Sequence, residues 1–185
     1  MEHFYQNIPG WFSYDYMYKD AVERAESGQL FVEIGSYKGQ STSYMCVEIA
    51  NSGKDIKFEC IDPMKLMGHY ENIPPNEKEG YSSDEFHKRL ESVKDYYTLH
   101  EMTSDDAVSL YEDGSIDFLL VDGDHSYEAV KKDIINYLPK MKKGGVIVCD
   151  DAWSTDVQNA LRDALDGTGQ EAQMANGIHF WIEIV

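Results

Sequence analysis

Residues 30–42, LFVEIGSYKGQST, decide the fold class of this 185-residue chain. The apolar run 30–34 predicts a β-strand, the segment GSYKG predicts a turn, and a helical pattern begins at about Ser41. A strand followed by a turn and a helix is the repeating unit of parallel sheets whose faces are covered by helices. Gly35 and Gly39 in the turn allow the backbone to approach a ligand closely, and the first amides of the helix can face that ligand.

The same alternation of apolar run and helical pattern occurs five times along the chain. The run 116–121, IDFLLV, is apolar throughout, which predicts a central strand buried on both faces. Near the end of the chain, Asn176-Gly177 lies between two further runs and predicts a terminal hairpin. The expected fold is α/β, with a Rossmann-like, doubly wound, mostly parallel seven-stranded sheet and a C-terminal antiparallel hairpin, in one domain over 1–185. The expected strands are 30–34, 57–61, 97–101, 116–121 and 146–149, and the expected helices are 41–50, 84–93, 105–111, 127–138 and 155–165.

Two segments outside these units are expected to border a ligand site. Residues 1–28 are rich in Tyr and Trp and predict an N-terminal helix or lid. Residues 63–83 contain several Pro and Gly residues and predict a long loop on the substrate side. The aromatic side chains of these segments either hold a substrate or belong to the core, and the sequence favours neither interpretation. At the N-terminus they are Tyr5, Trp11, Phe12 and Tyr14.

The composition restricts the partners of the protein. The chain carries 34 acidic and 16 basic residues, which gives a formal net charge of −18. This charge disfavours nucleic acids and anionic membranes as partners and favours a neutral or cationic ligand. Three cysteines in apolar stretches, with no apolar run of about 18 residues, indicate a soluble protein of the cytoplasm. Homo-oligomerisation is left open. The cysteines are Cys46, Cys60 and Cys149.

Acidic residues near the ends of the first two strands indicate a nucleoside ligand. Glu33 lies just before the glycine turn, where it can pair with an ammonium group and would repel a pyrophosphate. Asp62 ends the second strand, at a position where a carboxylate can accept two ribose hydroxyls. After the third strand, Ser104 and Asp105 can reach an adenine edge. The alternatives are a turn-forming role for Asp62 and an ordinary helix N-cap at Ser104.

Four aspartates follow the fourth and fifth strands, in VDGDHSYE and VCDDAW. If those strands are adjacent and parallel, their carboxyl ends lie about 5 Å apart. The carboxylates would then repel one another unless a cation neutralised them, and oxygen ligands suit Mg²⁺, Ca²⁺ or Mn²⁺. His125 is placed to act as a base on a hydroxyl that the metal polarises. The aspartates are Asp122, Asp124, Asp150 and Asp151.

Structural roles are the alternative for the same residues. Asp151 would then cap the following helix, and His125 would be a polar loop residue. The chain has no G-x-S-x-G, Walker or paired-cysteine motif, which excludes serine hydrolases, NTPases and zinc proteins. The remaining histidines have no partner at ligand or triad spacing and are interpreted as structural or surface residues: His3, His69, His87, His100 and His179.

Together these motifs resemble the class I S-adenosylmethionine (SAM) dependent methyltransferases over about residues 28–185. The sequence is most similar to the metal-dependent O-methyltransferases of the macrocin and mycinamicin type, and more distantly to the catechol and caffeoyl-CoA group. The resemblance implies a metal, Mg²⁺ above all, held by Asp122, Asp150 and Asp151. It also implies that Asp122 and His125 are the catalytic residues, with His125 at the position where the catechol group has Lys. Tyr37 departs from the commonest turn, E/D-x-G-x-G, because it replaces the second glycine.

The resemblance implies SAM as the cofactor and metal-assisted O-methylation of a hydroxyl on a small molecule or sugar as the reaction. One alternative is a catalytically inactive nucleoside-binding protein, against which the intact site residues count. Another is a nicotinamide-dependent oxidoreductase, disfavoured because the turn has no second close glycine. The residues expected to contact SAM are Glu33, Gly35, Ser36, Tyr37, Gly39, Ser41, Asp62, Pro63, Ser104, Asp105 and Asp122.

Overall fold

The computed structural model describes residues 1–65 and 74–185, and a seven-stranded sheet forms its centre. Its strands are β1 (Leu30–Ile34), β2 (Lys57–Ile61), β3 (Thr98–His100), β4 (Ile116–Val121), β5 (Met141–Cys149), β6 (Gln173–Ala175) and β7 (His179–Glu183). They follow the order β3-β2-β1-β4-β5-β7-β6. The first five strands pair in parallel, and β7 is antiparallel to both β5 and β6. The predicted fold class is therefore confirmed.

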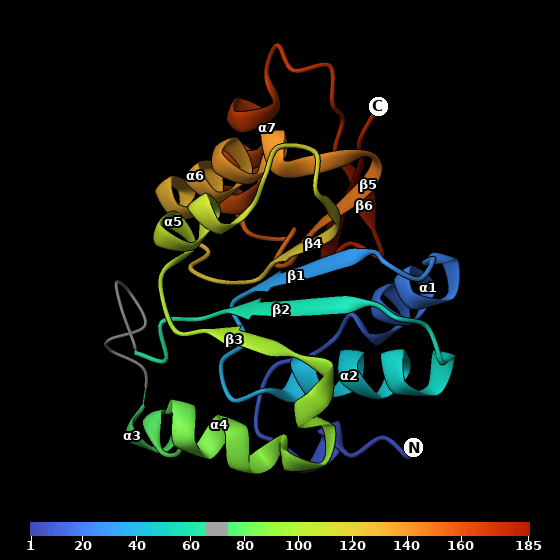
Figure 1. Ribbon diagram of the computed structural model, residues 1–185. Helices are drawn as coiled ribbons and strands as arrows, with labels where there is room; N and C mark the ends of the chain where they lie inside the picture. Colours follow the sequence, from blue (N-terminus) through green and yellow to red (C-terminus); the bar gives the residue numbers. More distant parts are fainter. Residues whose placement is uncertain (66–73) are drawn as a thin grey trace.

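Helices cover both faces of the sheet (Figure 1). One face carries α1 (Asp15–Arg24), α2 (Gln40–Ser52) and α4 (Ser83–Arg89). The other face carries α5 (Ser104–Ala107), α6 (Tyr127–Tyr137) and α7 (Thr155–Leu165). The connections contain a short helix, α3 (Pro75–Lys78), and 3₁₀ turns η1 (Tyr5–Asn7), η3 (Glu91–Tyr96), η4 (Val108–Leu110) and η5 (Leu138–Lys140).

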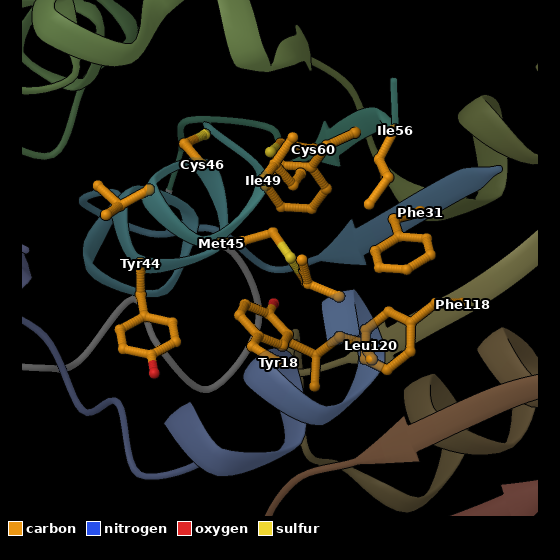
Figure 2. Close-up of a cluster of buried hydrophobic side chains, with 14 of the residues drawn as sticks. Tyr18, Phe31, Tyr44, Met45, Cys46, Ile49, Ile56, Cys60, Phe118 and Leu120 are labelled. Carbon is orange, nitrogen blue, oxygen red and sulfur yellow. The ribbon is translucent and has the colours of Figure 1, made fainter. Parts of the chain in front are cut away.

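The hydrophobic core consists of two layers, one on each side of the sheet. Figure 2 shows the layer beneath α1 and α2, where Tyr18 and Met45 approach Phe31 of β1. β4 contributes to both layers: Phe118 and Leu120 face α1 and α2, and alternate residues face α6 and α7. The continuous apolarity of this strand follows from its burial on both faces.

β5 begins at Met141, earlier than the predicted start at 146. Gly144 and Gly145 lie inside the strand rather than ending the helix before it. The β4–β5 register shifts between Ile116 and Phe118, and a Cβ on Gly145 would lie 2.8 Å from the Lys142 carbonyl oxygen. The glycine pair therefore makes room for a bulge, which a local pattern cannot distinguish from a turn.

Two of the predicted helices are each divided in two. The pattern over 84–93 forms α4 and then η3, inside which Val93 has a non-helical φ of −127°. The pattern over 105–111 forms the short α5 followed by η4. The two divided segments flank β3, which is only Thr98–His100 rather than the predicted 97–101.

The N-terminal 28 residues contain η1 and α1, and Met17, Tyr18 and Val22 of α1 are buried against the sheet. The loop predicted over 63–83 includes α3, and its residues 66–73, with His69, lie outside the described residues. Within the described parts of the chain, no helix is both long and apolar enough to cross a membrane.

Candidate active site

A cavity of about 750 Å³ lies at the carboxyl ends of β1, β2, β4 and β5. This is the edge at which open α/β sheets bind their ligands. Most of the predicted site residues line it: Gly35, Ser36, Tyr37, Ser41, Asp62, Pro63, Ser104, Asp105, Asp122, His125, Asp150 and Asp151. Glu33 and Gly39, which were also expected to contact the cofactor, do not line this cavity.

The turn after β1 brings the backbones of β1 and β4 together. Gly35 has a φ of +88°, and a Cβ there would lie 2.1 Å from the Asp122 carbonyl oxygen, so that only glycine fits. Tyr37, which replaces a glycine of the commonest pattern, also has a positive φ, of 47°. Its ring stacks on Trp11 with centroids 5.2 Å apart, and its hydroxyl donates to the Glu77 carbonyl oxygen. These contacts hold the Tyr37 backbone in a left-handed conformation that glycine usually adopts.

Asp62 ties this turn to the loop after β2. One carboxylate oxygen accepts hydrogen bonds from the amides of Ser36 (2.9 Å) and Tyr37 (2.8 Å). The other accepts from the Met64 amide (2.7 Å) and from the Tyr81 hydroxyl. Burial raises the pKa of Asp62, although these four donors lower it in part. The turn-forming alternative thus matches the contacts, and a ribose would have to displace a donor such as Tyr81.

Glu33 is fully buried behind the cavity wall. Its carboxylate accepts hydrogen bonds from the Tyr18 hydroxyl (2.5 Å) and the Thr42 hydroxyl (2.6 Å). Burial raises the pKa of Glu33, and the hydroxyl donors partly oppose that rise. In this arrangement Glu33 joins α1 to α2, and its predicted contact with a ligand ammonium stays a prediction.

The acidic cluster forms where β4 and β5 end side by side. Val121 pairs with Cys149 in the parallel register, so that Asp122 and Asp150, the next residues, are neighbours. One ligand atom each of Asp122, His125 and Asp150 lies within 4.8 Å of the others, a spacing that could hold a metal ion. Asp151 instead approaches His125: its Oδ2 is 2.6 Å from Nδ1. The N-cap of α7 is Ser154, so Asp151 does not cap that helix.

His125 lies between two carboxylates. Its Nε2 is 3.1 Å from Asp122 Oδ1, and its Nδ1 contacts Asp151. Burial by itself would lower the pKa of His125, but hydrogen bonds to the two carboxylates outweigh it and raise this pKa to about 10. Burial also raises the pKa of Asp122 to about 7, against the opposing effect of His125. Without a cation in the cluster, His125 is therefore protonated at neutral pH.

The Asp150 carboxylate offers a test of whether a cation fits. Its Oδ1 is buried and accepts no hydrogen bond from the described residues, although His179 Nε2 lies 3.0 Å away. A buried carboxylate oxygen without a hydrogen-bond donor is costly unless something else neutralises it. The carboxylates of Asp122 and Asp150 offer the oxygen ligands that Mg²⁺ or Mn²⁺ prefers. The residues therefore fit a hard divalent ion.

The sequence reasoning gave Asp133 no role, interpreted His179 as a structural or surface residue, and left Tyr14 open between substrate contact and core. His179 is fully buried beside Asp150, because the antiparallel register pairs Cys149 with Phe180 and makes the adjoining residues neighbours. Tyr14 donates its hydroxyl to Asp122 Oδ2 at 2.5 Å, which no local pattern indicates. Asp133 lies one helical turn after Ala129 on α6, and both line the cavity.

Asp133 accounts for the position of Ser104. The Ser104 hydroxyl donates to Asp133 Oδ1 at 2.5 Å. Burial raises the pKa of Asp133 to about 6, and the Ser104 hydroxyl lowers it in part. The N-cap of α5 is Thr103, whose hydroxyl accepts from the Asp106 amide, so the N-cap alternative for Ser104 is wrong. Asp105 forms an ion pair with Lys132 at 2.5 Å.

The other histidines form local contacts away from the acidic cluster. His3 is 2.7 Å from a Glu48 oxygen, and His100 is 2.9 Å from Glu59. His87 lies 2.8 Å from the Tyr97 hydroxyl at the surface.

Comparison with known proteins identifies the family. Residues 32–152, more than half of the chain, match the family described as "Methyltransferase domain". An uncharacterized protein of Acanthamoeba polyphaga mimivirus is 32% identical over 139 residues, which are 71% of this chain. An uncharacterized protein of Sinorhizobium fredii is 31% identical over 124 residues, or 65% of this chain. The chain spans 57% and 13%, respectively, of the lengths of these two relatives.

Solved structures share the fold at low sequence identity. The O-methyltransferase NovP superimposes with a TM-score of 0.73 and 15% identity, covering 92% of this chain and 79% of NovP. The O-methyltransferase TomG from Streptomyces achromogenes, in complex with SAM, gives a TM-score of 0.63 and 14% identity over 92% of this chain and 78% of TomG. The family match and the strand order together show that the chain belongs to the methyltransferase domain family and has the class I methyltransferase fold.

Proposed function

We propose that this protein is a SAM-dependent O-methyltransferase that transfers a methyl group to a hydroxyl of a small molecule or sugar with the help of a divalent cation. The observation that supports the proposal most strongly is the position of the cluster of Asp122, His125 and Asp150. It lies in the same cavity as the glycine turn after β1. A cofactor held at the turn and an acceptor held at the cluster would meet within that cavity.

SAM is proposed to bind against the cavity wall formed at the ends of β1, β2 and β3. Gly35 and Ser36 at the turn, and Ser41 at the start of α2, line the part of the cavity proposed for the methionine part. Asp62 and Ser104 are the residues proposed for the nucleoside. TomG, which shares this fold, binds SAM in its own structure.

The divalent cation is proposed to bind to Asp122 and Asp150. Asp151 lies next to this site and contacts His125. A bound Mg²⁺ would lower the pKa of an acceptor hydroxyl and neutralise the acidic cluster. The Asp150 Oδ1 supports this assignment, because it is buried and accepts no hydrogen bond from residues 1–65 and 74–185.

His125 is the proposed general base. Asp151 accepts the Nδ1 proton and orients the ring, so that Nε2 is the nitrogen that takes the acceptor proton. Bound SAM would supply the methyl group: the acceptor oxygen would bond to the methyl carbon as the carbon–sulfur bond broke, with its electron pair left on sulfur. The products would be the methyl ether and neutral S-adenosylhomocysteine, and His125 would hold the proton. The work of the protein is thus alignment and deprotonation.

The acceptor is proposed to lie against the aromatic residues that close the cavity from the N-terminal segment. Trp11, Phe12 and Tyr14 line the cavity there, and Tyr37 meets them from the turn after β1. Aromatic faces of this kind bind flat rings and the apolar faces of sugars. An acceptor without negative charge suits the acidic surroundings.

A nicotinamide-dependent oxidoreductase receives less support. Tyr127 and Lys131 have the Tyr-x-x-x-Lys spacing of a proton relay, but neither lines the cavity. The Tyr127 hydroxyl donates to Asp163 at 2.8 Å.

Calorimetry of the full chain with SAM, S-adenosylhomocysteine and NAD tests the cofactor. We expect both sulfur nucleosides to bind more tightly than NAD, whose pyrophosphate meets an acidic site. Tighter binding of NAD would overturn the assignment and favour an oxidoreductase.

A panel of catechols and sugars, assayed with SAM and Mg²⁺ for S-adenosylhomocysteine release, tests the chemistry. With an acceptor that the wild type methylates, His125→Ala should slow methyl transfer by ~10² to 10⁴-fold and leave S-adenosylhomocysteine affinity nearly unchanged. His87→Ala, which removes an exposed histidine far from the cluster, is the matched control. Equal rates in the two variants would remove His125 from the mechanism.

A further inference from the structure

We propose that residues 13–18, at the start of α1, form an outer brace that positions both carboxylates of the metal site, so that divalent-cation affinity depends on this segment. The inference rests on the metal site of the proposed function. The brace lies more than 100 positions in sequence from both carboxylates, and tertiary packing alone brings them together.

The first contact of the brace is with Asp122. The Tyr14 hydroxyl donates to Asp122 Oδ2 at 2.5 Å, and the Tyr14 side chain is almost completely buried. Its ring packs edge-on against Phe12 (centroids 4.8 Å apart) and Tyr18 (5.3 Å), which fixes the direction of the hydroxyl. Asp122 Oδ2 is thereby held, while Oδ1 faces His125.

The second contact of the brace runs through His179 to Asp150. Ser13 Oγ lies 3.3 Å from His179 Nε2, and the Tyr16 hydroxyl lies 3.3 Å from Nδ1. His179 is fully buried at the start of β7, and its Nε2 is 3.0 Å from Asp150 Oδ1. The imidazole therefore fills the space between the brace and Asp150 and limits the directions in which that carboxylate can turn.

These contacts have the character of an outer coordination shell. Carboxylates that hold a metal bind it well when other groups fix their orientation, and loss of such a group typically costs 10 to 100-fold in affinity. Tyr14 and His179 fix the two proposed ligands from the side of α1. They are positioning residues and take no part in methyl transfer themselves.

Tyr18 supplies a matched control within the same segment. It is fully buried and donates its hydroxyl at 2.5 Å to a carboxylate, as Tyr14 does, but its acceptor is Glu33. Glu33 does not belong to the cluster that could hold a metal. Removal of either hydroxyl disturbs a buried tyrosine–carboxylate pair, and only Tyr14→Phe touches a proposed metal ligand.

The experiment measures Mn²⁺ binding to the full chain by electron paramagnetic resonance, without SAM or acceptor. We expect Tyr14→Phe to raise the Mn²⁺ Kd about 10-fold or more and to alter the spectrum of the bound ion, whereas Tyr18→Phe stays within about twofold of wild type. His179→Asn should weaken Mn²⁺ binding in the same way. Melting temperatures of the metal-free variants identify any loss that merely follows a general loss of stability.

The outcomes separate the brace from the proposed function. If the wild type binds Mn²⁺ and the two phenylalanine variants shift its Kd equally, the brace is wrong while the metal site stands. A wild type that binds no Mn²⁺ overturns both the metal site and the brace.

Discussion

The buried carboxylates around the cavity differ in the hydrogen-bond donors that contact them. Asp62 accepts four hydrogen bonds and Glu33 accepts two from hydroxyls, so both serve the packing of the turn and of α1. Asp150 retains a buried oxygen that accepts no hydrogen bond within the described part of the chain, although His179 Nε2 lies 3.0 Å away. Because an unsatisfied carboxylate is unstable in a buried position, Asp150 is the acid that most needs a ligand.

Tyr81→Phe should strengthen S-adenosylhomocysteine binding if the ribose takes the place of the Tyr81 hydroxyl on Asp62. The variant leaves one oxygen of Asp62 with only the Met64 amide, so the ligand no longer competes with a protein donor. Calorimetry of wild type and variant gives the ratio of the two Kd values. An unchanged or larger Kd in Tyr81→Phe would show that Asp62 acts in the turn alone.

Asp133→Asn should stabilise the protein more at pH 7.5 than at pH 4. The folded-state pKa of Asp133, about 6, lies above its ordinary value of 3.8 because burial disfavours the charged form. The unfolded chain therefore ionises first, and folding stability is lost as the pH rises from about 4 through about 6. The loss is at most about 3 kcal/mol, and asparagine avoids it while still accepting from Ser104.

Thermal unfolding across this pH range measures the effect of Asp133→Asn. Asp95→Asn removes an exposed carboxylate and controls for the change in net charge. A gain from Asp133→Asn that is the same at pH 4 and pH 7.5 would contradict the raised pKa.

At the scale of secondary-structure elements, the ends of β1, β2 and β4 form a tightly bonded junction. The Gly35 amide donates to the Ile61 carbonyl, and the Asp122 amide donates to the Ile34 carbonyl, both at 2.9 Å. These bonds tie the carboxyl ends of the three strands together. Because the cavity begins at the same ends, any displacement of this junction changes the site as well as the stability.

Gly35→Ala should cost more stability than Gly53→Ala and should abolish S-adenosylhomocysteine binding. Both glycines have a positive φ, +88° and +67°, so both substitutions carry the strain of that conformation, roughly 1–2 kcal/mol. A Cβ on Gly35 would also meet the Asp122 carbonyl at 2.1 Å, while a Cβ on Gly53 meets nothing within 4 Å. Denaturant unfolding and calorimetry compare the two variants, and equal losses would mean that the junction can move apart.

At the scale of the whole molecule, a chain with a formal net charge of −18 gathers several acids at one end of its sheet. The two core layers hold the strands in register, and the register keeps Asp122 and Asp150 adjacent despite their repulsion. A divalent cation would remove this repulsion in the folded state only. Binding of such an ion would therefore stabilise the entire fold.

Mg²⁺ should raise the melting temperature of the wild type and have no such effect on Asp150→Ala. At a hundredfold excess of Mg²⁺ over its Kd, the gain in unfolding free energy is ~2.7 kcal/mol. Asp156→Ala, which removes an exposed acid of α7, should respond as the wild type does. An equal response of Asp150→Ala would place the ion elsewhere.

The sequence by itself determined the features that depend on neighbouring residues. The glycine turn after β1, the apolar strand 116–121 and the hairpin at Asn176-Gly177 are local patterns, and the structure confirms the sheet that they predicted. The closeness of Asp122 and Asp150 could also be predicted, because parallel neighbouring strands end at one edge.

Only the tertiary structure decided how the buried acids are satisfied. Tyr14 reaches Asp122 across 108 positions, and Tyr81 reaches Asp62 from a connection without a regular pattern. His179 lies beside Asp150 because β7 returns antiparallel to β5. Such contacts depend on how whole elements dock against one another, and the hydrophobic period of a segment carries no information about its distant partner.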